Sequence, residues 1–102
     1  MNPGAFQKLD KIIHEKARLA IVSLLAASPE LSFTEIRDTL NLTDGNLCIQ
    51  LRTLQQAGYI AVTKTFENRR PRTTCALTAK GRQAFAGYIG ILEQIVRQNR
   101  PN

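Results

Sequence analysis

The chain has 102 residues, the size of a single domain, with 14 lysines and arginines against 8 aspartates and glutamates, for a net charge of +6. Its hydrophobic fraction of 43% and charged fraction of 22% are typical of a folded protein with an ordinary core. No segment approaches the roughly 20 apolar residues of a membrane span, and the first residues lack the layout of a secretory signal. The two cysteines, Cys48 and Cys75, form no C-x-x-C pair, which indicates a reducing environment. We therefore expect a cytoplasmic protein with no membrane partner.

The positive charge is concentrated in one part of the chain. Residues 1–44 carry a net charge of −1, residues 45–92 carry +6, and residues 93–102 carry +1. A one-sided basic block of this kind is typical of a protein that binds a polyanion such as nucleic acid. An anionic membrane surface is the alternative ligand.

The first expected element is a helix over residues 9–28, because apolar residues recur there at helical spacing. From Ala17 onward this segment is apolar almost all round, which predicts burial on all sides. So small a domain can supply only part of that burial, and a second subunit is expected to supply the rest. Pro29 ends the helix.

Two short helices follow in the arrangement of a helix-turn-helix. Ser32 and Glu35 have the spacing of a capping box, which predicts a helix over residues 33–40. After a turn, Thr43 can cap a third helix that extends to about residue 57. A helix, a three-residue turn and a second helix are the parts of a DNA-binding helix-turn-helix.

A basic β-hairpin is expected next. Residues 59–66 are rich in β-branched and aromatic side chains, and residues 73–77 can pair back against them. Asn68 and Pro71 supply turn chemistry between the two strands. The arginines in this turn have no evident role in stabilising the fold and are suited to binding phosphate. A basic turn that is merely solvated is the alternative.

The last expected element is a helix over residues 79–98, capped by Thr78. It carries two apolar rows, one suited to its own domain and the other to a partner helix. A single wide core face is the alternative. The candidate homodimer-interface residues on this helix and the first are Ile12, Leu19, Tyr88, Ile91, Leu92 and Ile95.

Four segments carry a resemblance to a known family. Residues 42–47, 51–60, 69–74 and 77–82 resemble the corresponding parts of small winged-helix transcriptional regulators related to the MarR and ArsR groups. The resemblance covers about residues 9–98. It implies a dimeric repressor or activator that places the third helix in the major groove of double-stranded DNA and the hairpin, or wing, on the backbone or in the minor groove.

The face of the third helix opposite its leucine stripe is expected to meet DNA. Asn and Gln side chains suit adenine there, apolar groups suit the thymine methyl, and a glycine lets the backbone approach phosphate. A plain solvated helix face is the alternative. With the basic residues of the hairpin, the candidate DNA-binding residues are Thr43, Gly45, Asn46, Ile49, Gln50, Arg52, Thr53, Lys64, Arg69, Arg70 and Arg72.

No chemistry beyond binding is indicated. His14 is the only histidine and is expected on a helix surface, so one chain cannot assemble a metal site of ordinary spacing. Phosphate-binding loops and catalytic arrangements of serine and histidine are absent, which argues against an enzyme and against a cofactor. Cys48 could be a redox switch, although a small residue filling a helix face is the simpler interpretation.

We therefore predict one domain over residues 1–102, with a core over about 9–98 and loose ends at 1–8 and 99–102. Its fold class is α+β, mostly α: a winged helix-turn-helix with a long C-terminal dimerisation helix. The predicted function is a homodimeric, sequence-specific DNA-binding transcriptional regulator. The alternative is a winged-helix module for protein–protein interaction in a larger assembly. Whether a small-molecule effector exists does not follow from the sequence.

Overall fold

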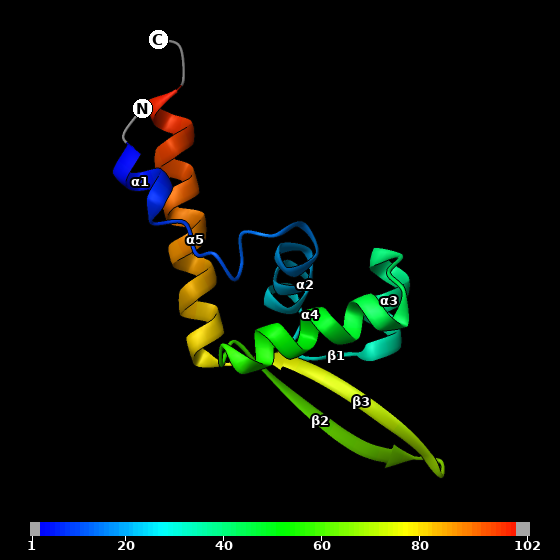
Figure 1. The fold of residues 1–102 in the computed structure, drawn as a ribbon. Helices are drawn as coiled ribbons and strands as arrows, with labels where there is room; N and C mark the ends of the chain where they lie inside the picture. The colour runs from blue at the N-terminus through cyan, green and yellow to red at the C-terminus, as the bar shows by residue number, and fades with distance from the viewer. Residues whose placement is uncertain (1–2, 100–102) are drawn as a thin grey trace.

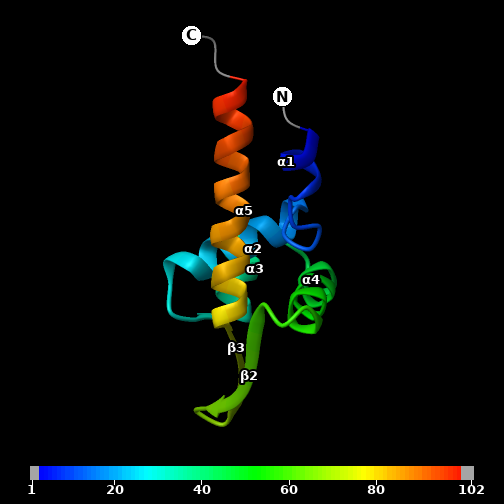
Figure 2. The ribbon, with the colours of Figure 1, turned by 90° about the vertical axis from the view of Figure 1, so that its left-hand side faces the viewer.

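The computed structural model describes residues 3–99. Its helices and strands, in chain order, are α1 (Pro3–Gln7), α2 (Lys16–Ala27), β1 (Leu31–Ser32), α3 (Phe33–Leu40), α4 (Asp44–Gln56), β2 (Ile60–Glu67), β3 (Arg70–Leu77) and α5 (Ala79–Gln98). The molecule is elongated, with principal extents of 58 × 25 × 21 Å. Helix α5 projects from one side of the body with α1 beside it, and the β2–β3 hairpin projects from the other side (Figures 1 and 2). This arrangement confirms the predicted mostly helical winged-helix class.

The main core lies between α2, the helix-turn-helix and the base of the sheet. It consists of buried apolar side chains from α2, α3, α4, β2 and β3: Ile21, Val22, Leu25, Ile36, Leu47, Leu51, Leu54, Ile60 and Cys75. The leucine stripe of α4 thus faces inward, as its spacing predicts. The opposite face of α4 is consequently left toward solvent.

The first long helix is shorter than expected. It begins at Lys16, and residues 9–15 form turns and bends, so the prediction of a helix over 9–28 is wrong for its first seven residues. The Asp10 carboxylate accepts the backbone N–H groups of Ile12 and Ile13 at 2.8 and 3.1 Å. Glu15 then caps α2 by accepting from the backbone of its first turn. Two carboxylates therefore satisfy N–H groups that a continuous helix would have bonded to its own backbone.

The start of the chain also differs from expectation. Residues 1–8 were expected to be a loose end, but Pro3–Gln7 form helix α1 and Ala5 is buried. Asn99 caps the end of α5. Residues 1–2 and 100–102 lie outside the described residues, so the rest of the expected loose ends is not tested.

The sheet is antiparallel and has the strand order β1-β3-β2. The two-residue strand β1, which pairs Leu31 with Cys75, was not predicted because two residues carry no readable alternation. The hairpin turn consists of Asn68 and Arg69 alone, both with positive φ, 53° and 65°, as a two-residue hairpin turn requires. Arg70, Pro71 and Arg72, which were expected in the turn, therefore belong to β3.

Helix α5 is fixed tightly to the junction that follows α4. Thr78 caps α5, as predicted, by accepting from the Gly81 N–H at 3.0 Å, and its hydroxyl donates to the Gly58 carbonyl at 2.6 Å. A Cβ on Gly81 would lie 2.1 Å from the Tyr59 carbonyl oxygen, so only glycine fits. Gly58 has a φ of 80° and follows α4 as the predicted C-terminal glycine. The orientation of α5 is thereby coupled to the end of α4.

Candidate nucleic-acid interface

The outer face of α4 is exposed where the sequence places its candidate contacts. The Thr43 hydroxyl caps the helix by accepting from the Asn46 N–H at 3.1 Å. Asn46 and Arg52 are exposed, and Ile49 has 58% of its surface in solvent. Thr53 is half-buried and donates to the Ile49 carbonyl at 3.2 Å. The face thus offers an amide and an apolar group in the first half of the helix and a cation in its second half.

Gly45 lies in the first turn of α4 with open space beside it. Apart from the adjoining helix backbone, a Cβ at this position would meet no atom of residues 3–99 within 4 Å. Packing inside the protein therefore gives no reason for glycine here. A close approach of the backbone to something outside the chain would give one.

The angle between the two helices of the helix-turn-helix is held by polar contacts. Arg37 on α3 donates to Asp44 at the start of α4, and also to Asp38, both at 2.9 Å. Asn41, in the left-handed conformation with φ of 54°, ends α3. The Arg37–Asp44 ion pair is the contact among these that joins α3 to the start of α4.

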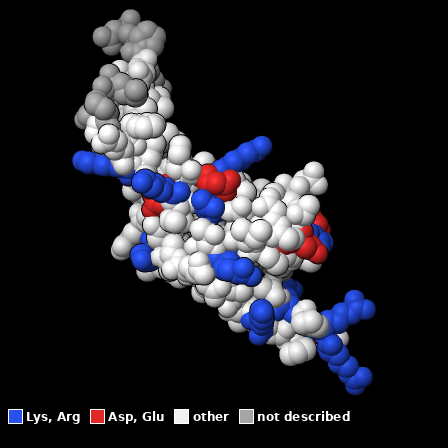
Figure 3. All heavy atoms as spheres, in the orientation of Figure 1, with Lys and Arg blue, Asp and Glu red and all other residues white. Residues whose placement is uncertain are grey.

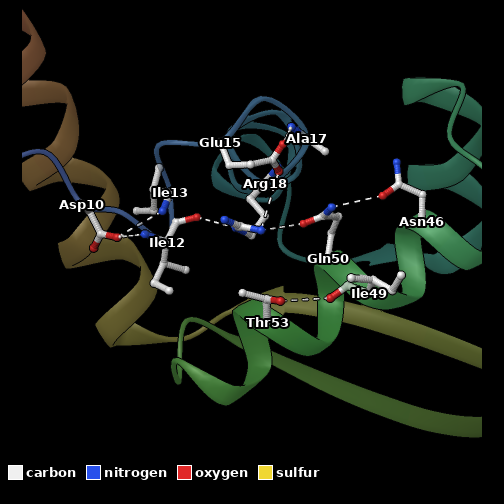
Figure 4. A network of polar contacts seen from close by, with 10 residues as sticks. All are labelled: Asp10, Ile12, Ile13, Glu15, Ala17, Arg18, Asn46, Ile49, Gln50 and Thr53. Carbon is white, nitrogen blue, oxygen red and sulfur yellow. Dashed lines mark hydrogen bonds and ion pairs between the residues drawn. The ribbon is translucent and has the colours of Figure 1, made fainter.

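A chain of polar contacts connects α2 to the outer face of α4 (Figure 4). Arg18 donates to the Gln50 side-chain oxygen at 2.8 Å, and the Gln50 amide nitrogen donates to the Asn46 side-chain oxygen at 3.1 Å. Both ends of the Gln50 amide are therefore occupied, although the sequence suggested a residue free to read bases. Arg18 was not among the candidate residues, and no local pattern points to it.

The far end of the hairpin is strongly basic, and its lysine and arginine side chains project into solvent (Figure 3). Lys64, Arg69 and Arg70 are exposed, and no ion pair or hydrogen bond is found for their side chains among residues 3–99. Arg72 differs, because it contacts Glu67 at 2.9 Å and Glu35 at 3.5 Å. Two of the three hairpin arginines are thus unpaired, and the third is already close to two carboxylates.

An apolar residue also lies at the end of the hairpin. Phe66 is 80% exposed and pairs across the hairpin with Pro71. We did not select Phe66 from the sequence, although an aromatic residue within a basic turn was a visible signal. Its ring adds apolar surface beside the unpaired cations.

Among the candidate interface residues on α5, Tyr88 is already covered by its own chain. It is 3% exposed, packs with Leu9 and Ile13, and its hydroxyl lies 2.8 Å from Nδ1 of His14. The irregular segment over 9–15 folds back onto Tyr88 and covers it within one chain, so its place in a dimer interface stays a prediction. His14 is exposed as predicted, but in a bend and not in a helix.

The other candidate interface residues are partly covered within the chain. Ile12 packs on the main core, and Leu19, Ile91, Leu92 and Ile95 pack around the Leu9–Ile13–Tyr88 cluster. All five are half-buried, and Val96 on the same helix is 51% exposed. One chain therefore leaves part of the apolar surface of α5 in solvent.

The two cysteines differ in environment. Cys48 is exposed on α4. Cys75 is buried, and burial raises the pKa of its thiol to about 11. Across residues 3–99 there is no group of three potential metal-ligating side chains. No helix in that range has the length and apolar character required to cross a membrane.

Comparisons with known proteins agree with this geometry. Residues 17–96 match a family described as a winged helix DNA-binding domain. An uncharacterised protein from Methanocaldococcus jannaschii is 37% identical over 79 residues, which cover 78% of this chain and 86% of that protein.

Two solved structures show the same fold. The transcriptional regulator homologue from Pyrococcus horikoshii superposes with a TM-score of 0.87 and 26% identity, over 93% of this chain and 96% of that one. The S. aureus MepR protein, solved in complex with DNA, gives a TM-score of 0.76 and 20% identity, over 94% and 78% of the two chains. The resemblance to winged-helix transcriptional regulators that the sequence suggested is confirmed.

Proposed function

The chain belongs to the winged helix DNA-binding domain family, a family of transcriptional regulators and not of enzymes, and from this we propose that it binds double-stranded DNA as a homodimer. Helix α4 lies in the major groove in this proposal, and the β2–β3 hairpin contacts the backbone or the minor groove. The candidate DNA contacts are those selected from the sequence, with Gln50 and Arg72 already engaged within the chain.

One observation carries the proposal. The polar face of α4 is exposed on the same domain as a hairpin that ends in unpaired arginines. Arg69 and Arg70 bury little surface and have no acidic partner among residues 3–99, so the fold itself gains little from them. Phosphate is the partner that such cations suit. The DNA complex of the similar protein MepR supports this choice of ligand.

The homodimer is proposed from α5. Gly87 and Gly90 lie inside this helix, where each costs on the order of 1 kcal/mol relative to alanine. Outside the adjoining helix backbone, a Cβ at either position would meet no atom of the described residues within 4 Å. Close approach of a second helix would explain both glycines and would cover the remaining surface of Ile91, which lies beside Gly87 on the helix. Two recognition helices about 34 Å apart would then match an inverted-repeat site.

Two finer expectations stay predictions. An effector, if one exists, is expected to bind near the proposed dimer interface between the first and last helices. The cytoplasmic location is expected from the proposed contact with DNA and from the unpaired cysteines.

The experiment that tests the proposal combines selection and sedimentation. Duplexes with a randomised segment are selected by the unmodified protein at low salt, and enrichment of an inverted repeat is expected. The same protein should sediment as a dimer at micromolar concentration. Failure to bind any duplex would refute DNA binding and favour the protein-interaction alternative.

The Ile91→Asp variant should sediment as a monomer, because a carboxylate would be buried against the partner helix. It should also bind the selected site far more weakly, because the two half-site contacts are no longer linked. Thr39→Asp adds the same charge at an exposed position on α3 and serves as the control for sedimentation. If the unmodified protein is a monomer, the proposed dimer is wrong.

A further inference from the structure

We propose that Gln50 is a positioning residue and not a base reader: Arg18 orients the Gln50 amide, and Gln50 turns the Asn46 amide so that its NH₂ group is presented to an acceptor atom on a base edge. This inference rests on the proposed DNA-binding function and deepens it, because it assigns the chemical preference of one reading residue. It also names a residue outside α4, Arg18, as a determinant of that preference.

The first step is that Arg18 is itself held in place. Its Nε donates to the Ile12 carbonyl at 2.6 Å, and its Nη1 lies 3.8 Å from the Glu15 carboxylate. The Arg18 side chain is only 18% exposed. Burial is the largest single influence on the pKa of Glu15 and raises it, but the backbone hydrogen bonds from Ala17 and Arg18 and the Arg18 charge together lower it, so this carboxylate is ionised at neutral pH. The guanidinium is therefore a fixed donor behind α4.

The second step is that donor and acceptor chemistry sets both amide orientations. Arginine has no acceptor, so the Gln50 atom at 2.8 Å from it is the oxygen. The Gln50 NH₂ group then faces Asn46, and because an NH₂ group only donates, the Asn46 atom at 3.1 Å is its oxygen. The Asn46 nitrogen consequently points away from Gln50 (Figure 4). It has no hydrogen-bond partner within the part of the chain that the structure describes.

The third step concerns which bases suit this arrangement. An outward NH₂ group requires an acceptor, which guanine and adenine provide at N7 and thymine at O4. The Asn46 oxygen keeps one free lone pair, so adenine can also donate to it from its N6 amino group. Cytosine presents only its N4 donor in the major groove and suits the arrangement least. The base opposite Asn46 is therefore expected to be adenine by preference, with guanine and thymine tolerated and cytosine disfavoured.

The decisive variant is Gln50→Glu. A carboxylate at this position keeps its contact with Arg18 but can no longer donate to Asn46. Asn46 must then turn and donate its own NH₂ group to the carboxylate, which leaves its oxygen facing outward. The preference at the base position that Asn46 reads should shift by about tenfold toward cytosine, which offers a donor. That position is identified as the one at which Asn46→Ala abolishes discrimination.

The matched control is Gln56→Glu, which adds the same charge at an exposed position on α4 outside the contact chain. It should weaken binding to all four bases alike, through repulsion of phosphate. If Gln50→Glu behaves in the same way and leaves the base preference unchanged, the positioning role of Gln50 is wrong. If the unmodified protein binds no duplex at all, the proposed function fails and the reading role with it.

A second measurement tests the contact chain without DNA. In nuclear magnetic resonance spectra of the free protein, Arg18→Met should shift the side-chain amide signals of Gln50 and Asn46. The signals of Gln55, exposed on the same helix, should stay in place. Unshifted Gln50 and Asn46 signals in a folded Arg18→Met variant would overturn the assignment of Arg18.

Discussion

Replacing Arg69 and Arg70 should weaken DNA binding and make the affinity depend less steeply on salt concentration. Both side chains project from the hairpin end and have no ion-pair partner among residues 3–99, so each can displace a counterion from a phosphate. Arg69 has a φ of 65°, which asparagine tolerates well, and Arg69→Asn with Arg70→Gln therefore removes both charges while keeping the turn.

The expected magnitude follows from the number of phosphate contacts. Each contact contributes roughly 0.9 to the slope of log affinity against log salt, so two arginines on each of two wings amount to about 3.6. Arg72→Ala should change the slope by less per residue, because Arg72 already lies close to Glu35 and Glu67. Fluorescence anisotropy of a labelled duplex, titrated at several salt concentrations, measures both slopes.

Phe66→Ala provides the control. Phe66 is 80% exposed at the same end of the hairpin and carries no charge. Its loss can lower affinity by removing apolar contact, but the slope should stay unchanged. If the double arginine variant retains the full slope, the hairpin does not contact phosphate. If Arg72→Ala flattens the slope by half as much as the double variant or more, the distinction drawn from the two carboxylates is wrong.

Three further outcomes follow from the structure. Gly45→Ala should raise the free energy of unfolding by about 0.5–1 kcal/mol, since its Cβ has open space among residues 3–99. It should nevertheless weaken DNA binding, because the added Cβ would separate the backbone from phosphate. Unfolding and binding titrations of one sample check the two effects, and unchanged affinity would contradict the contact. Tyr59→Phe should cost about 2 kcal/mol at pH 8, because the Tyr59 hydroxyl donates to the Asp10 carboxylate. That hydrogen bond, with burial, raises the pKa of Tyr59 to about 12. The stabilisation from the hydrogen bond is therefore complete below about pH 10 and is lost as the pH rises through 12. Thermal unfolding across this range should show the stability difference between the unmodified protein and Tyr59→Phe closing, and a constant difference would refute the role of the hydrogen bond. A thiol reagent should modify one cysteine in the native protein, the exposed Cys48, and should reach Cys75 only in denaturant, because Cys75 is buried with a raised pKa.

The helix-turn-helix could be predicted from sequence because its signals are local. Ser32 and Thr43 cap the two helices with hydroxyls that accept from the N–H groups three residues ahead, as their spacing indicates. The leucine stripe of α4 determines which side is buried and therefore which positions are exposed. The exposure of Asn46 and Ile49 follows from helical geometry alone.

Local signals were misleading where two of them competed. The apolar spacing over residues 9–15 suits a helix, but the Asp10 and Glu15 carboxylates accept the backbone N–H groups and keep the segment irregular. At the hairpin, Pro71 suggested a wide turn, whereas the strands continue to a turn of Asn68 and Arg69. The register of a hairpin depends on pairing along the whole ladder, which a single proline does not determine.

The contacts that give the candidate site its chemistry were decided by the tertiary structure. Arg18 and Gln50 are 32 residues apart, and they meet only because α2 packs across α4. Arg72 reaches Glu35 only because β1 brings the start of α3 to the sheet. The sequence by itself determined which faces are polar, apolar or basic, since those depend on periodicity and composition. Which polar side chains are free to bind DNA and which are already bonded depended on long-range packing, and no spacing along the chain encodes that.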